Sequence, residues 1–166
     1  MAVTFEDKGM THTYTQQIPF EIITDSPEET EKAGMALAAL MQAESLPPFV
    51  ALFGDLGVGK TAFVRGFTSS IAPSARVKSP TFALVNEYKG DKLSVFHFDM
   101  YRIEDEDELY SIGFYDYADR NGICLVEWSE NIIDFLPEKY IKVEIVKDLL
   151  KGENYRKISV QFGKNQ

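Results

Sequence analysis

The apolar and polar residues of this chain follow strand and helix periods in turn. Residues 49–53 form a continuous apolar run, Phe-Val-Ala-Leu-Phe, which is typical of a strand buried on both faces of a sheet. Residues 123–126 form a second such run, and residues 20–24 alternate as a half-buried strand does. Residues 140–146 and 156–162 predict a final pair of strands.

Helices are predicted between these strands. Ser26 is suited to cap a first turn in which Pro27 takes the first helical position and Glu29 completes a capping box. This helix is expected to run to about residue 43, where two prolines soon follow. A second helix is predicted over residues 62–71.

The middle of the chain adds a strand pair and another helix. Residues 81–88 and 93–98 predict two strands joined by a turn. The acidic run at 104–108 is suited to the first turn of a helix that ends near residue 112. This mixed order of helices and strands predicts a three-layer α/β fold with a partly antiparallel sheet.

A single domain is expected over residues 17–166, since no linker or repeat interrupts it. Residues 1–16 are polar and rich in threonine, and we expect them to form a flexible leader.

The charge and composition narrow the possible partners. The chain has 166 residues, a formal net charge of −9 and 45% hydrophobic residues, which is typical of a globular protein. An acidic surface repels nucleic acid, so RNA is expected to be reached only through a partner. No apolar stretch approaches the ~18 residues of a membrane span, and the single cysteine, Cys124, lies in a buried run. We expect a cytoplasmic protein without a membrane interaction.

A glycine-rich loop joins the strand at 49–53 to the helix that follows it. Residues 54–61 match the pattern Gly, four residues, Gly-Lys-Thr between a strand and a helix, which is the P-loop of nucleotide-binding proteins. Backbone N–H groups of such a loop surround phosphate oxygens, the lysine reaches the β- and γ-phosphates, and the hydroxyl binds Mg²⁺. The sequence therefore predicts a three-layer P-loop NTPase-like domain that binds ATP and Mg²⁺ through Asp55, Leu56, Gly57, Val58, Gly59, Lys60 and Thr61.

A P-loop protein also needs a carboxylate at the end of a neighbouring strand to hold the metal. Glu127 follows the apolar run at 123–126, and Asp99 follows the strand predicted at 93–98. We favour Glu127 as the metal ligand because its strand is apolar on both faces, and we expect Asp99 to lie nearby. His97 is interpreted as a hydrogen-bonded strand histidine. Arg102 could contact a phosphate or pair with the acidic helix, and we favour the ion pair or another structural role.

Four segments, in this order and spacing, resemble the TsaE (YjeE) family of bacterial ATPases. They are the P-loop, Lys-Ser-Pro-Thr-Phe at 78–82, His-Phe-Asp-Met-Tyr-Arg at 97–102 and Leu-Val-Glu-Trp at 125–128. The resemblance spans about residues 20–145. It implies a slow ATPase needed for the threonylcarbamoyladenosine (t6A37) modification of tRNAs that read codons beginning with A. It also implies a TsaD–TsaB complex as the partner, with tRNA reached only through that complex.

The resemblance further implies roles for individual residues. Lys60, Thr81 and Asp99 would be catalytic, with Thr81 sensing the γ-phosphate, while Thr61 and Glu127 would hold Mg²⁺. Trp128 would lie beside the nucleotide, and Ser26 and Pro27 would line the adenine pocket.

Three other functions are compatible with a P-loop. A GTPase would normally carry an Asn-Lys-x-Asp segment, which is not present in this chain. A small-molecule kinase would usually have an arginine-bearing lid, whereas the segment after Arg102 is acidic. A nucleotide-switched binding module differs from the ATPase only in whether the protein must hydrolyse ATP in order to function.

Overall fold

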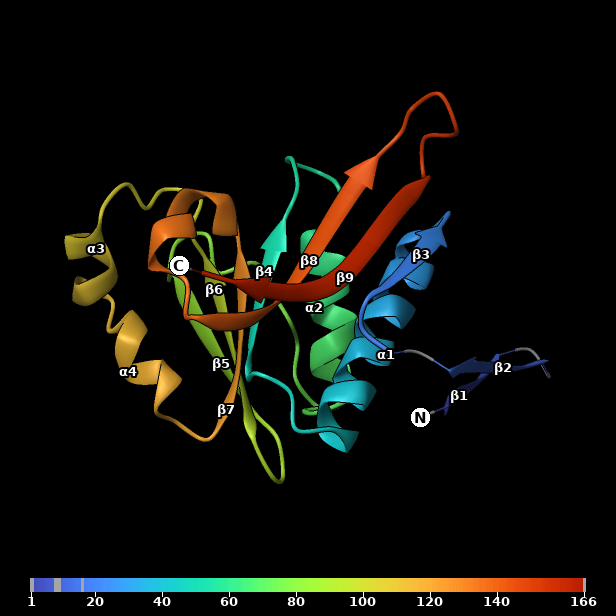
Figure 1. The fold of residues 1–166 in the computed structure, drawn as a ribbon, viewed down its shortest axis with the longest axis horizontal. Helices are drawn as coiled ribbons and strands as arrows, with labels where there is room; N and C mark the ends of the chain where they lie inside the picture. Colours follow the sequence, from blue (N-terminus) through green and yellow to red (C-terminus); the bar gives the residue numbers. More distant parts are fainter. Residues whose placement is uncertain (1, 8–9, 16, 166) are drawn as a thin grey trace.

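The fold is built on a seven-stranded mixed sheet (Figure 1). The computed structural model describes residues 2–7, 10–15 and 17–165, and its sheet has the strand order β3-β9-β8-β4-β7-β6-β5. The central pairs β8-β4, β4-β7 and β7-β6 are parallel, and the outer pairs are antiparallel. The strands are β3 (Phe20–Thr24), β4 (Phe49–Phe53), β5 (Val85–Lys89), β6 (Ser94–Asp99), β7 (Gly122–Glu127), β8 (Lys139–Lys147) and β9 (Arg156–Lys164).

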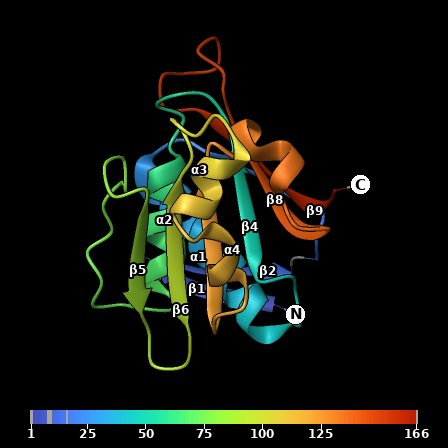
Figure 2. The ribbon, with the colours of Figure 1, turned by 90° about the vertical axis from the view of Figure 1, so that its left-hand side faces the viewer.

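Helices cover both faces of this sheet. On one face α1 (Pro27–Ala43) and α2 (Lys60–Ser69) lie side by side, and the other face carries α3 (Glu106–Ser111), α4 (Phe114–Ala118) and the 3₁₀ segment η1 (Ser129–Phe135) (Figures 1 and 2). Strand β4 contributes Val50 and Leu52 to the first core and Ala51 to the second, because successive side chains point to opposite faces. The predicted three-layer α/β fold with a mixed sheet is confirmed.

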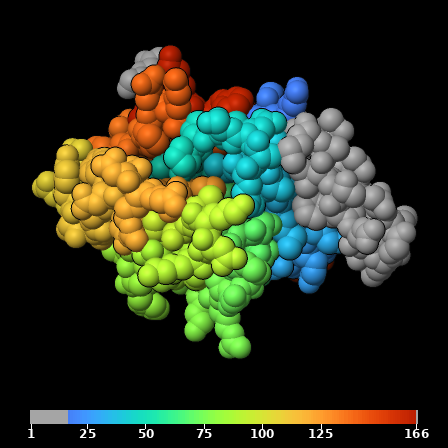
Figure 3. All heavy atoms as spheres, turned by 90° about the horizontal axis from the view of Figure 1, so that it is seen from below, coloured from blue at the N-terminus to red at the C-terminus, as the bar shows by residue number. Residues whose placement is uncertain are grey.

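The parallel strands place the loops that follow them at one edge of the sheet. The loops after β4, β6 and β7 therefore meet at the top of the molecule in Figure 1. The segments that lead into these strands lie at the opposite end of the molecule, which Figure 3 shows from below. Ligands of open α/β sheets bind at the carboxyl edge. Among the described residues no helix is both long and apolar enough to cross a bilayer.

The start of α1 has the predicted capping box. The Ser26 hydroxyl accepts a hydrogen bond from the Glu29 N–H at 3.1 Å, and the Glu29 carboxylate accepts one from the Asp25 N–H at 2.7 Å.

Cys124 in β7 is a free, buried thiol, and burial raises its pKa to about 12.

The structure differs from the sequence-based expectation in three places. Residues 81–84 form a turn rather than the first half of a strand, because Leu84 has φ 63° and its N–H bonds the Pro80 carbonyl at 2.7 Å, so β5 begins only at Val85. The helix expected from the acidic run is confirmed as α3, which ends at Ser111, but a further short helix, α4, follows it after Gly113 with φ 70°. Neither α4 nor η1 was expected.

Two further strands are described in the first part of the chain. β1 (Ala2–Asp7) and β2 (Met10–Thr15) pair as a separate antiparallel sheet. The flexible leader expected for residues 1–16 stays a prediction, and residues 1, 8, 9 and 16 lie outside the described part.

Helices α1 and α2 approach each other at two glycines. A Cβ atom at Gly34 would collide with the backbone carbonyl of Phe63, and one at Gly66 would collide with the carbonyl of Glu31. The collisions involve backbone atoms of a neighbouring helix, so they cannot be relieved by a side-chain rotation.

We expect Gly34→Ala to lower the free energy of unfolding by about 3 kcal/mol, because the two helices must separate to admit the methyl group. Gln42→Ala, on an exposed position of the same helix, is the matched control and should change it by less than about 0.5 kcal/mol. Urea unfolding of both variants measures this. Equal stabilities of the two variants would show that the contact between α1 and α2 is not tight.

Candidate functional site

The loop between β4 and α2 has the backbone shape of a phosphate-binding loop. Gly57 has φ 76° and Gly59 has φ 105°, and L side chains rarely adopt either conformation. The loop leads directly into the first turn of α2, whose free N–H groups and dipole favour an anion. The glycines of the motif are therefore required by the turn itself.

Two side chains from distant parts of the chain hold this loop. Arg156 in β9 donates from Nε to the carbonyl of Val58 at 2.8 Å and from a terminal nitrogen to the carbonyl of Gly57 at 3.5 Å. On the other side, the Gly54 N–H donates to the Glu130 carboxylate at 3.3 Å. Neither contact is predicted from the sequence, because nothing near Arg156 or Glu130 in sequence indicates a contact with the loop.

A hollow of about 440 Å³, the central hollow, lies in front of the loop. Its walls come from the loop, the start of α2 and the carboxyl ends of β6 and β7, together with the turn before β5. It brings together every predicted site residue except Ser26 and Pro27: Asp55, Leu56, Gly57, Val58, Gly59, Lys60, Thr61, Thr81, Asp99, Glu127 and Trp128. Ser79 and Tyr101, which were not among the predicted site residues, complete the lining.

Glu127 links the loop helix to the sheet. Its carboxylate accepts a hydrogen bond from the Thr61 hydroxyl, with Oε1 at 3.0 Å and Oε2 at 3.2 Å, and Oε1 lies 2.7 Å from Nε2 of His97. Glu127 and His97 are both buried, with 3% and 0% of their surfaces exposed. His97 is thus the hydrogen-bonded strand histidine that was expected, and its partner is the candidate metal ligand.

Asp99 lies beside Glu127 at the end of the neighbouring strand. The two residues are paired in the register of β6 and β7. Asp99 accepts hydrogen bonds from the Tyr101 N–H at 3.0 Å and from the Ser79 hydroxyl at 3.4 Å, and that hydroxyl lies 2.9 Å from the Thr81 hydroxyl. The carboxylate of Asp99 is therefore connected to the turn before β5, whereas that of Glu127 is connected to Thr61.

Lys60 is folded back onto its own loop. Its ammonium group donates to the carbonyl of Gly54 and, at 3.0 Å, to the carbonyl of Asp55. It also lies 3.7 Å from the centre of the Trp128 ring. Burial lowers the pKa of Lys60, and the carboxylates of Glu130 and Glu127 act in the opposite direction.

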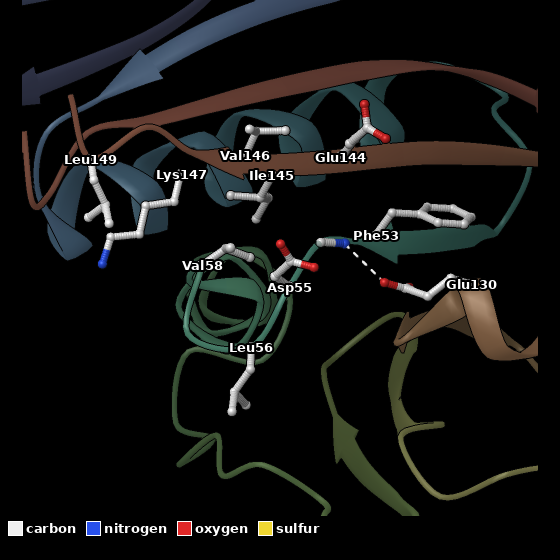
Figure 4. Close-up of a pocket in the computed structure, with 11 residues that line it drawn as sticks. Phe53, Asp55, Leu56, Val58, Glu130, Glu144, Ile145, Val146, Lys147 and Leu149 are labelled. Carbon is white, nitrogen blue, oxygen red and sulfur yellow. Dashed lines mark hydrogen bonds between the residues drawn. The ribbon is translucent and has the colours of Figure 1, made fainter. Parts of the chain in front are cut away.

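A second hollow, the side hollow, lies on the other side of the loop and measures about 530 Å³. Figure 4 shows Val58 of the loop and Ile145 of β8 lying close together there, with Glu130 reaching the loop from η1. Leu149, from the segment after β8, lines its outer part. Ser26 and Pro27 line neither the central nor the side hollow.

The expected ion pair of Arg102 is not present among the described residues. Its guanidinium group lies 5.5 Å from the centre of the Phe82 ring instead of on the acidic helix. The physical reason is the turn at 81–84, which brings Phe82 to the surface beside Arg102.

The donor set of the central hollow suits an octahedral, hydrated cation. In the described part of the chain, no cluster of three or more His, Cys, Asp or Glu side chains could hold a metal ion. Thr61 and Glu127 nevertheless place one hydroxyl and one buried carboxylate side by side. Mg²⁺ in nucleotide sites usually takes few protein ligands and completes its shell with water and phosphate oxygens, so these residues fit it.

Comparisons with known proteins agree with this geometry. Residues 24–158 match the family model described as threonylcarbamoyl adenosine biosynthesis protein TsaE. The chain belongs to the TsaE family. The resemblance carried by the four sequence segments is thereby confirmed.

Relatives named tRNA threonylcarbamoyladenosine biosynthesis protein TsaE occur in several bacteria. The Bacillus subtilis TsaE protein is 39% identical over 137 residues, covering 82% of this chain and 81% of the relative. The Aquifex aeolicus protein is 37% identical over 143 residues, covering 84% and 94%. A crystal structure of YdiB from Bacillus subtilis superposes with a TM-score of 0.67 at 29% identity, covering 89% of this chain and 90% of that one.

We expect His97→Asn to lower the free energy of unfolding by about 2 kcal/mol more than His97→Gln. The amide nitrogen of glutamine lies at the position of Nε2 and can still donate to Glu127, whereas that of asparagine lies near Nδ1, so Glu127 loses a partner inside the protein. Urea unfolding at pH 7 measures the difference. If the two variants were equally stable, the contact between His97 and Glu127 would not position the carboxylate.

Proposed function

We propose that this protein is a Mg²⁺-dependent P-loop ATPase required for the threonylcarbamoyladenosine (t6A37) modification of tRNAs that read codons beginning with A, and that it acts with the TsaD–TsaB complex. The observation that carries the proposal is the central hollow, where a phosphate-binding loop faces Thr61, Glu127 and Asp99. Membership of the TsaE family supports the pathway. We further propose a cytoplasmic location.

The triphosphate of ATP would lie along the loop in front of α2. The backbone N–H groups of residues 57–61 would surround its oxygens, and Lys60 would exchange its two backbone carbonyl partners for the β- and γ-phosphates. The exchange is favourable because a phosphate carries full negative charge and a carbonyl does not. It also moves the ammonium group relative to the Trp128 ring, so that the single tryptophan of the chain reports on binding.

Thr61 and Glu127 would hold Mg²⁺, directly or through water. When bound, the ion would neutralise charge on the phosphates and hold them in position. Glu127 is favoured over Asp99 for this role because it already bonds the Thr61 hydroxyl. The hydrogen bond from His97 would keep the Glu127 carboxylate oriented toward Thr61.

Asp99 and Thr81 would act on the γ-phosphate side. The carboxylate of Asp99 faces the central hollow and can accept a hydrogen bond from an attacking water, while Thr81 can donate its hydroxyl to a phosphate oxygen. The bonds from Ser79 to both residues would transmit a movement of Thr81 to Asp99.

The adenosine would lie in the side hollow, which is continuous with the loop through Asp55, Leu56 and Val58. Ile145 and Val58 provide apolar surface for a purine. Ser26 and Pro27 do not line this hollow, and Ser26 caps α1, so the proposal that they contact the adenine rests on the family resemblance alone.

The partner would supply a second positive group, which the central hollow lacks among its described lining residues. Among the described residues that line the central hollow, Lys60 is the only cation. Rapid phosphoryl transfer usually needs a further positive group at the γ-phosphate, such as an arginine. The net charge of −9 also favours a protein partner over direct contact with tRNA.

We expect slow ATP turnover by the purified protein with Mg²⁺ and a sharp rise when the TsaD–TsaB complex is added. Lys60→Ala should abolish turnover and weaken ATP binding by about 1.5–3 kcal/mol, because a charge-assisted phosphate contact is lost. Phosphate release measures turnover, and isothermal titration calorimetry measures binding, because Lys60→Ala lacks the ammonium group that lies on the Trp128 ring. Turnover at the same rate with and without the complex would contradict the partner requirement.

The same assay separates an ATPase from a nucleotide-switched binding module. Asp99→Asn removes the charge of the carboxylate while keeping its shape, so ATP binding should persist and turnover should fall by about 100-fold or more. We expect tRNA modification by the reconstituted system to fall with it. Full modification with this variant would show that hydrolysis is not needed.

A further inference from the structure

Among the side chains of residues 17–165, Phe82 is the most exposed aromatic one, with 90% of its surface accessible. An exposed phenylalanine loses the free energy of burial that its ring would otherwise gain. Its position is defined by the turn at 81–84, which ends at Leu84 with φ 63°. Its neighbour Thr81 lines the central hollow, so Phe82 lies one residue from the proposed γ-phosphate sensor.

A third hollow of about 260 Å³, the Phe82 hollow, opens beside this ring. Leu84, Ile103 and Ile112 give it an apolar floor, and Arg102 and Glu108 lie on its walls. Arg102 is held 5.5 Å from the centre of the Phe82 ring. Thr81 lines both this hollow and the central hollow, so the two share one wall.

The protein surface beside this hollow is strongly acidic. The five residues 104–108 are all acidic and exposed. Within the part of the chain that the structure describes, none of these five carboxylates lies in an ion pair with a lysine or arginine of this chain. Carboxylates so close together repel one another, and a basic surface placed against them would relieve that repulsion.

We infer that the Phe82 hollow and the acidic run 104–108 form a docking surface for a protein partner that inserts an apolar side chain beside Phe82 and places Lys or Arg residues against the run. The inference rests on the proposed function, because it locates the surface that meets the TsaD–TsaB complex. The observations that select this occupant are an apolar floor with an aromatic edge and an unpaired row of negative charge beside it. Buried aromatic anchors are typical centres of protein interfaces.

Such a partner would act on the site through Thr81. A side chain inserted in the Phe82 hollow contacts one side of the wall that Thr81 forms, and a phosphate in the central hollow contacts the other. ATP and the partner would therefore influence each other's binding by the same factor.

The test measures binding of the TsaD–TsaB complex to the full-length protein by biolayer interferometry. Phe82→Ala should weaken binding at least about tenfold, as expected for an interface anchor, and Phe82→Tyr should restore most of it. Phe162→Ala is the matched control, because Phe162 is also exposed but lies in β9, away from β5 and β6 in the sheet, and it should bind within twofold of the unchanged protein. Affinity for ATP, measured by Trp128 fluorescence, and turnover without the partner should stay within twofold for Phe82→Ala.

A charge test addresses the acidic run separately. Glu104→Gln combined with Asp107→Asn removes two charges without touching the caps formed by Asp105 and Glu108. This double variant should reduce the dependence of the partner affinity on salt concentration. The control, Glu44→Gln combined with Asp91→Asn, removes two exposed charges elsewhere and should keep the salt dependence of the unchanged protein.

The outcomes distinguish the two proposals. If the unchanged protein does not bind the TsaD–TsaB complex, the partner in the proposed function is wrong and this inference fails with it. If the unchanged protein binds and Phe82→Ala binds equally well, the docking surface lies elsewhere, while the proposed function stands. Tenfold weaker binding by Phe82→Ala, with ATP affinity kept, supports the inference.

Discussion

The arrangement of the site depends on a buried carboxylate that must be paired. Glu127 lies at the end of a central strand with almost no contact with water, and a charge in that position is costly unless hydrogen bonds compensate it. Thr61 and His97 supply those bonds from α2 and from β6. One side chain thus connects the helix after the loop with two strands of the sheet.

The glycine-rich loop between β4 and α2 is held in a comparable way, by residues that lie far from it in sequence. Arg156 satisfies carbonyls on the back of the loop, and Glu130 satisfies the N–H of Gly54. With these groups satisfied by the protein, the remaining N–H groups at the start of α2 are left for a ligand. The anion binding proposed for this acidic protein therefore relies on backbone dipoles rather than on a surplus of cations.

The sequence predicted those parts of the site that are encoded by residues close together in the chain, and it did not predict contacts between distant residues. The loop is a contiguous pattern, and Glu127 and Asp99 each follow a recognisable strand, so the rule that parallel strands end at one edge placed them together. Arg156 lies 98 residues from Val58, and only the pairing of β9 with β8 brings it to the loop. The turn at Leu84 was missed because Thr81 and Phe82 have high strand propensity, and a positive φ at a leucine is not visible in composition.

The thiol in β7 has a practical consequence for work on this protein. Its raised pKa and its place in the second core keep Cys124 in the unreactive thiol form at neutral pH. A cysteine introduced on the surface would thus be the one that reacts with a maleimide dye. Spectroscopic labels can be attached at chosen positions of the otherwise unaltered chain, so that distances can be followed while nucleotide and partner bind.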